Sequence, residues 1–149
     1  MIPEDDGLEA APVLRRMHAV PAYREFGLRF TDAGRGWAEL TFEPCEKANN
    51  FYGFVHGGVW LLAADSAMGG ALATLATEQD QVITTQLDFR WLHRFGGEVA
   101  VARGRVRHRG RSVCHCDVEF TDEDGKPFAA GSGTYVVMRP EAGGESSPG

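Results

Sequence analysis

One long apolar segment, GGVWLLAADSAMGGALATLAT over residues 57–77, constrains the fold of this chain more than any other feature. Its length, its alanines and its lack of an interior proline favour a helix over a strand. The segment is apolar almost all round, which is typical of a helix that is buried on most sides. A carboxylate, Asp65, nevertheless lies within it. Burying a carboxylate is costly unless it is hydrogen-bonded or paired, so Asp65 needs a physical reason to be there.

Candidate strands lie on both sides of this predicted helix, and those that follow it show period-2 alternation. Residues 27–34 and 36–44 predict two strands that a tight, glycine-containing turn joins. Four further strands are predicted at about residues 81–95, 97–108, 111–125 and 126–138. This order predicts an α+β fold in which a curved antiparallel sheet wraps around one long central helix. A single sheet of this kind leaves an edge uncovered, so we expect the chain to pair with a second copy of itself.

The chain has the usual length of one domain, at 149 residues. Residues 1–20 predict an N-terminal helical segment, in which an amphipathic helix over residues 8–19 is ended by Pro21. Residues 21–139 form the main domain, and the small, polar residues 140–149 predict a disordered tail. Glycines 69 and 70 inside the central helix predict close approach of another backbone, because glycine lowers helix stability.

Composition and charge disfavour several classes of function. The net charge of −6 disfavours nucleic-acid binding and anionic membrane surfaces. No apolar run approaches the roughly 20 residues that span a bilayer, and the N-terminus lacks the parts of a signal peptide, so we expect a cytoplasmic protein. Three cysteines argue against a disulfide framework, and Cys114 and Cys116 are expected in the core. The histidines show no zinc spacing, so we expect no metal.

The residues that point to chemistry lie at the start of the long helix. Asn50 begins a loop that leads to His56, Gly57 and Gly58, and Asp65 follows eight residues beyond Gly57. Free N–H groups and the positive end of the helix dipole are found where a helix begins, and glycine lets a substrate approach closely. Such a helix start can bind a carbonyl oxygen as negative charge develops on it. The alternative is structural: Asp65 pairs with a basic group or lies at a dimer interface.

These residues resemble the hotdog-fold acyl-CoA thioesterases of the phenylacetate-degradation (PaaI-like) type. The resemblance covers roughly residues 20–138, and its specific part is Asn50, Gly53, the His56-Gly57-Gly58 turn and Asp65. It implies that residues 21–139 are a hotdog thioesterase domain. It also implies that the asparagine and the glycine turn come from one subunit and the helix acid from its dimer partner.

The resemblance implies a role for each site residue. Asp65 would be the nucleophile or the general base, Gly57 N–H the oxyanion donor, His56 a group that positions the carbonyl, and Asn50 a group that positions the water or the acid. A hydroxyl residue on the strand after the helix often joins such a site, which points to Thr84, with Thr85 as the second choice.

Substrate contacts are expected around these residues. Phe51, Tyr52, Phe54 and Trp60 surround the motif and indicate an apolar or aromatic acyl group, and we expect Gly58, Phe54 and Trp60 to contact the substrate. Arginine occupies every second position from 103 to 111, which predicts a row on one strand face. Most of this row is expected to pair with Asp117 and Glu119 on the next strand, whereas Arg109 or Arg111 would contact the phosphates of coenzyme A.

The resulting prediction is an acyl-CoA thioesterase that hydrolyses an aryl- or medium-chain acyl-CoA to free acid and CoA. It needs no cofactor, because CoA is part of the substrate. We expect a homodimer that pairs into a homotetramer, with no nucleic-acid or membrane partner. Two alternatives remain on the same fold: a hydratase or dehydratase of acyl-CoA, and a protein that binds acyl-CoA without catalysis.

Overall fold

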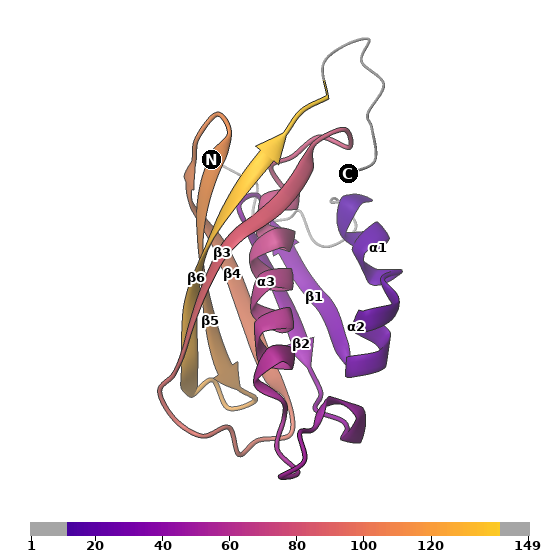
Figure 1. The fold of residues 1–149 in the computed structure, drawn as a ribbon, viewed down its shortest axis with the longest axis vertical. Coiled ribbons are helices and arrows are strands. Elements are labelled where there is room, and N and C mark those ends of the chain that lie inside the picture. Colours follow the sequence, from indigo (N-terminus) through magenta and orange to yellow (C-terminus); the bar gives the residue numbers. More distant parts are fainter. Residues whose placement is uncertain (1–11, 141–149) are drawn as a thin grey trace.

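The computed structural model describes residues 12–140 and shows six strands, one long helix and two short N-terminal helices (Figure 1). The parts of the predicted N-terminal segment and tail at residues 1–11 and 141–149 lie outside the described residues. The strands are β1 (Leu28–Gly34), β2 (Trp37–Phe42), β3 (Gln81–Trp91), β4 (Ala100–Arg109), β5 (Val113–Asp122) and β6 (Pro127–Met138). All six predicted strands are therefore present.

The strands form one antiparallel sheet in the order β1-β2-β4-β5-β6-β3. Strands β4, β5 and β6 are neighbours in chain order, whereas β3 pairs with the edge of β6 that faces away from β5. The sheet curves around the central helix α3 (Gly57–Ala73), which lies across its concave side (Figure 1). This is the α+β hotdog architecture that the resemblance implied, and the prediction is confirmed.

Helix α3 packs tightly against the sheet because small residues line the contact. A Cβ atom added to Gly104 of β4 would lie 2.3 Å from the carbonyl oxygen of Ala67, so only glycine fits there. The helix was predicted to extend to residue 77 but ends at Ala73. The hydroxyl of Thr74 explains this end, because it donates to the carbonyl of Ala71 at 2.7 Å and accepts from Gly36 N–H at 2.7 Å. These bonds replace the next helical turn.

The N-terminal part differs from the sequence prediction. Helix α1 spans Pro12–His18, and a second short helix, α2, spans Pro21–Phe26. Pro21, which was expected only to end a helix, begins α2 instead, because the first position of a helix needs no N–H donor. Both helices lie beside β1 and close to α3 (Figure 1). Leu14 of α1 is completely buried in the main core, which joins this segment to the domain.

The two helix glycines differ in their surroundings. A Cβ atom on Gly70 would lie 2.6 Å from the ring of Phe30 and 3.3 Å from the Cβ of Ala38, so close packing explains this glycine, although side chains and not the predicted backbone approach it. A Cβ atom on Gly69 would meet nothing within 4 Å. The prediction of close approach is therefore wrong for Gly69. No helix of the described residues is long and apolar enough to cross a membrane.

Candidate active site

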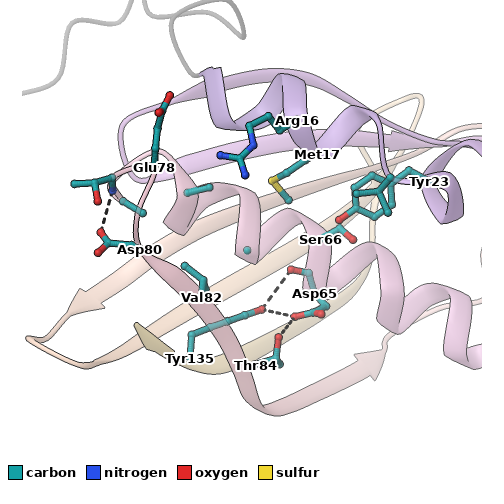
Figure 2. A pocket seen from close by; sticks show the side chains of 15 residues that line it. Arg16, Met17, Tyr23, Asp65, Ser66, Glu78, Asp80, Val82, Thr84 and Tyr135 are labelled. Carbon is teal, nitrogen blue, oxygen red and sulfur yellow. Dashed lines mark hydrogen bonds between the residues drawn. The ribbon is translucent and has the colours of Figure 1, made fainter. Parts of the chain in front are cut away.

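The carboxylate of Asp65 is held by two hydroxyl groups from the sheet (Figure 2). Thr84 of β3 donates a hydrogen bond to Oδ1 of Asp65 at 2.8 Å. Tyr135 of β6 donates to the same oxygen at 2.9 Å, and its hydroxyl also lies 3.4 Å from the backbone carbonyl of Asp65. Asp65 is partly exposed, although its helix neighbours Ala64 and Ser66 are buried. Hydrogen bonds thus offset part of the cost of placing a charge in an apolar helix.

The choice between the two threonines depends on a bulge in β3. The register of β3 against β6 shifts between Thr84 and Gln86, so regular alternation is interrupted at this point. Thr84 faces Asp65, whereas the hydroxyl of Thr85 donates to the carbonyl of Thr134 at 3.0 Å. The structure therefore places Thr84, the first choice of the sequence analysis, beside the acid.

Tyr135 was not predicted as a site residue from the sequence. Its side chain is only 1% exposed, and burial followed by the negative charge of Asp65 raises the pKa of its phenol. The phenol therefore stays protonated and acts as a hydrogen-bond donor. The sequence feature that could have pointed to it is a tyrosine at an inward position of an alternating strand, because a buried tyrosine hydroxyl usually needs a polar partner.

A cavity of about 430 Å³ lies above Asp65, between the N-terminal helices, α3 and β3. Asp65, Thr84, Tyr135 and Ser66 supply the polar groups on one side (Figure 2). The other walls include side chains from α1, α2, α3, β3 and the link between α1 and α2: Met17, Tyr23, Ala73, Val82 and Val20. The pKa of Tyr23 is raised, mainly by burial, so its phenol is also neutral. Gly69, one helical turn after Asp65, opens the space beside the carboxylate.

The far end of this cavity carries charged residues. Asp80 accepts a hydrogen bond from Thr77 N–H at 2.9 Å and forms an ion pair with Arg139 at 3.1 Å. The backbone hydrogen bond is the main reason that the pKa of Asp80 is lowered, and Arg139 adds to this effect. Arg16 and Glu78 also line this end.

The start of α3 presents the other predicted group of residues. His56 is the N-cap, and its Nδ1 accepts a hydrogen bond from Gly58 N–H at 2.9 Å. Because Nδ1 is an acceptor, the proton of a neutral His56 is on Nε2. Among the residues that the structure describes, the N–H of Gly57 has no acceptor. Asn50 organises the loop, with its Oδ1 accepting from Tyr52 N–H at 3.0 Å and Phe54 N–H at 3.2 Å.

One chain does not bring these two groups together. Gly57 and Asp65 lie on the same helix, eight residues apart. At about 1.5 Å of rise per residue, they are roughly 12 Å apart along the helix axis. A thioester carbonyl that binds one of them is therefore out of reach of the other in the same chain.

The two predicted aromatic contacts lie in different environments. Phe54 is exposed, and the guanidinium of Arg94 lies 4.3 Å from its ring centroid. Trp60 is 5% exposed and makes edge-to-face contacts in the core with Phe42, Phe95, Phe120 and Phe128. Both residues border a shallow hollow near the start of α3, lined also by Trp91 and Leu92. Their contact with substrate stays a prediction.

The arginine row divides into two parts at a bulge in β4. Before the bulge, Arg103 and Arg105 lie opposite Glu119 and Asp117 in the register. Arg107, at the bulge, forms an ion pair with Asp117. Between Val106 and His108 the register shifts, so Arg109 lies opposite the buried Cys114. Arg109 and Arg111 then line a second hollow, of about 890 Å³, together with Arg35 and Arg139. Four arginines therefore surround one hollow.

Metal ligation finds no support in the described residues. Within residues 12–140, no group of three or more His, Cys, Asp or Glu side chains is arranged to hold an ion. Cys114 and Cys116 are buried on one face of β5, as predicted, while His115 is exposed on the other. Burial raises the pKa of the Cys116 thiol to about 12, so it is protonated at neutral pH.

Comparisons with known proteins agree with this fold. The model of the thioesterase superfamily matches residues 52–129. A Saccharolobus solfataricus protein, provisionally named an esterase, is 30% identical over 108 residues, which cover 72% of this chain and 75% of that protein. A Listeria monocytogenes protein named 1,4-dihydroxy-2-naphthoyl-CoA hydrolase is 23% identical over 113 residues, which cover 76% of this chain and 92% of that protein.

A solved structure of the type expected from the sequence is also similar. The Escherichia coli PaaI protein from the phenylacetic acid degradation operon has a TM-score of 0.74 at 20% identity, and the match covers 85% of this chain and 90% of that one. The resemblance to PaaI-like hotdog proteins is thus confirmed. The chain belongs to the thioesterase superfamily and is a thioester hydrolase with the hotdog fold.

Proposed function

We propose that the protein hydrolyses an aryl- or medium-chain acyl-CoA to the free acid and CoA, with Asp65 as nucleophile or general base. The observation that carries this proposal is the carboxylate itself, which two hydroxyls hold at the wall of a cavity of about 430 Å³. This volume lies within the roughly 300–1,000 Å³ typical of small-molecule sites. An ionised carboxylate next to a thioester can attack the carbonyl carbon or remove a proton from water.

The apolar walls of the cavity support an acyl group of moderate size. Met17, Val20 and Val82 offer hydrocarbon surface near the carboxylate, and Tyr23 adds an aromatic ring. Flat rings and short hydrocarbon chains both match this mixture. The Listeria relative, whose name describes hydrolysis of a bicyclic aryl-CoA, favours the aryl choice. The predicted contacts of Phe54 and Trp60 would then lie on the partner's side of the site.

The oxyanion donor belongs, in this proposal, to a second chain. Gly57 N–H has no acceptor among the described residues and lies at the positive end of α3, where it would bind the thioester oxygen. Gly58 would allow close approach of the acyl group, His56 would donate from Nε2, and Asn50 would keep the loop in shape. Since about 12 Å of helix separates Gly57 from Asp65 of the same chain, a complete site needs one group from each protomer.

The edge strand β3 supports pairing of two chains. This strand has eleven residues and, among the described strands, pairs only with β6. Its other edge leaves backbone N–H and C=O groups open, and apolar side chains such as Ile83 and Trp91 are exposed on it. A long, open, partly apolar edge favours addition of a strand from a second copy. Thr84 lies on the same strand, so pairing here would place the partner near Asp65. Further pairing into a homotetramer stays a prediction.

The hollow with four arginines supports binding of the CoA phosphates. Arg109 and Arg111 were predicted for this role, and Arg35 and Arg139 join them around the hollow. Guanidinium groups match phosphate geometry and keep their charge at all relevant pH values. Ala76 borders both the arginine hollow and the cavity that contains Asp65, so the arginines lie next to that cavity. With CoA as part of the substrate, the reaction needs no cofactor, and a cytoplasmic location suits this substrate.

Mixing two inactive variants tests the shared site. Asp65→Asn removes the acid from one protomer, and Asn50→Ala disturbs the glycine loop of the other. Each variant alone should release little thiol from an aryl-CoA. After mixed refolding, a hybrid dimer has one site with both defects and one intact site, so activity should recover to about a quarter of the wild-type value. No recovery, in hybrids proved by a tag on one variant, would mean that both residues act within one chain.

A further inference from the structure

Tyr135 reaches Asp65 from the core side of the sheet. It lies on β6, 70 residues from Asp65 in sequence, and its hydroxyl donates to Oδ1 at 2.9 Å. The neighbouring Gly133 makes room for the ring, because a Cβ atom there would lie 2.7 Å from the ring and 3.1 Å from the hydroxyl of Tyr135. A tyrosine that is 1% exposed beside such a glycine has little freedom to move.

Thr84 and Tyr135 both donate to the same carboxylate oxygen (Figure 2). Among the described residues, no donor reaches the other oxygen, Oδ2. Two donors on one oxygen fix the plane of the carboxylate, and they withdraw the lone pairs of Oδ1 from reaction. Oδ2 keeps its lone pairs for a ligand.

Tyr135 acts here as a donor and not as an acid or base. Burial and the negative charge of Asp65 raise the pKa of its phenol, so the proton stays on the tyrosine throughout the pH range in which an enzyme is assayed. The phenol also contacts no other titratable side chain through a hydrogen bond in the described structure. The hydroxyl of Tyr135 therefore orients one oxygen of the Asp65 carboxylate.

We propose that Tyr135 is a positioning residue that, together with Thr84, holds Oδ1 and leaves Oδ2 as the reacting oxygen. This inference rests on the proposed function. If Asp65 is the nucleophile, Oδ2 bonds to the acyl carbon, the C–S bond breaks, and the thiolate of CoA takes a proton from solvent before water cleaves the anhydride. If Asp65 is the base, Oδ2 takes a proton from water as the water oxygen bonds to the acyl carbon. The C–S bond then breaks, and the proton on Oδ2 passes to the leaving sulfur.

Tyr135→Phe tests the proposal, because it removes only the hydroxyl and keeps the ring. We expect kcat for an aryl-CoA to fall on the order of tenfold to a hundredfold, as is typical when a reacting group loses its orientation. KM should stay within about twofold, since the cavity wall is unchanged. The matched control is Thr134→Val on the same strand, whose hydroxyl lies 3.2 Å from Nδ1 of His115 and away from Asp65. This control should keep the wild-type kcat.

Circular dichroism and thermal unfolding show whether each variant is folded. If Tyr135→Phe does not fold, Tyr135→Met is the second variant, because methionine adapts to irregular core space and also lacks the hydroxyl. The kcat criterion is the same for both. A folded variant with wild-type kcat, or one whose loss lies only in KM, would overturn the inference.

The outcome is separable from that of the proposed function. If Asp65→Asn abolishes thiol release while the folded Tyr135 variant is fully active, the thioesterase assignment stands and the positioning role fails. If wild type and Asp65→Asn release thiol equally, the proposed function itself fails. The double variant Tyr135→Phe with Thr84→Val adds a further criterion. The losses in kcat of the two single variants should be non-additive in the double variant, since both donors hold one oxygen.

Discussion

The hydroxyl of Thr84 lies 2.8 Å from Oδ1 of Asp65, which joins the edge strand of the sheet to the central helix. Nineteen residues separate the two along the chain, and the contact exists because β3, at the edge of the sheet beside β6, packs against the helix. The edge strand on which we expect the chains to pair therefore also carries a residue that holds the candidate catalytic acid.

Replacing Thr84 should affect the chemical step. Thr84→Val removes one hydrogen bond to a carboxylate, which is worth about 1.5–3 kcal/mol, so kcat should fall by roughly tenfold to a hundredfold. Thr84→Ser keeps the hydroxyl and should keep most of the rate. Thr85→Val is the control, because the Thr85 hydroxyl donates to a backbone carbonyl and not to Asp65. Equal rates for Thr84→Val and wild type would contradict a role for this contact.

The two helix glycines should respond in opposite ways to alanine. Gly69→Ala adds a methyl group where nothing lies within 4 Å, so the free energy of unfolding should rise by about 0.5–1 kcal/mol through helix propensity. Gly70→Ala places a Cβ atom 2.6 Å from the ring of Phe30 and should destabilise the fold. Urea unfolding of both variants measures this contrast.

Gly69 also lines the cavity, so its alanine variant gives a second result. The new methyl group should raise KM for a bulky aryl-CoA more than for acetyl-CoA, because it narrows the space beside Asp65. An equal change for the two substrates would argue against this cavity as the acyl site.

The arginine hollow predicts a dependence on the nucleotide part of the substrate. Arg109→Ala and Arg111→Ala should raise KM for acyl-CoA by about tenfold per lost charge-assisted contact, if each is worth about 1.5 kcal/mol. The same variants should treat the N-acetylcysteamine thioester of the same acid as wild type does, since it carries no phosphate. Arg105→Ala, from the exposed part of the row, is the control. An equal rise in KM for both substrates would mean that these arginines do not act by binding the phosphates of CoA.

Stability should decline in alkaline solution. Burial raises the pKa of the Cys116 thiol from 9.0 to about 12. In the unfolded chain this thiol ionises near its ordinary value, whereas in the folded protein it stays neutral. The stabilisation is therefore complete below pH 9 and is lost as the pH rises toward about 12. The raised pKa values of Tyr23 and Tyr135 should steepen the decline above pH 10.

Urea unfolding at a series of pH values measures this decline, and Cys116→Ala is the matched variant. Its stability should begin to fall nearer pH 10, where only the tyrosines contribute. A wild-type protein whose stability is unchanged from pH 8 to pH 11 would contradict the buried, neutral state of these groups.

The main elements could be predicted because each has a strong local pattern. The apolar run from Gly57 predicted the helix, period-2 alternation predicted the four strands after it, and a glycine-containing turn predicted the two strands before it. The start of α2 at Pro21 could not be separated from the end of α1, because proline is compatible with both. The helix end at Ala73 depends on the contact between Thr74 and Gly36, which is remote in sequence.

The site was predictable where the residue type alone demanded an explanation. Asp65 in an apolar helix and the two glycines after His56 are unusual, so they were found from the sequence. Tyr135 was not found, because a tyrosine in a β-strand is common and only the fold brings its hydroxyl to Asp65. The bulge that separates Arg109 from the rest of its row likewise arises from pairing between β4 and β5 and not from local sequence.

Thiol release from a panel of aryl- and alkyl-CoA substrates, by wild type and by Asp65→Asn, tests the central claim most directly. Asparagine keeps the shape of the side chain and can still accept from Thr84 and Tyr135, but it supplies neither a nucleophile nor a base. Asp88→Asn, on the exposed part of β3, is the control. We predict rapid release by wild type and by the control, with a loss of at least about a hundredfold in kcat for Asp65→Asn. Equal release by wild type and folded Asp65→Asn would contradict the assignment of Asp65 as the catalytic carboxylate.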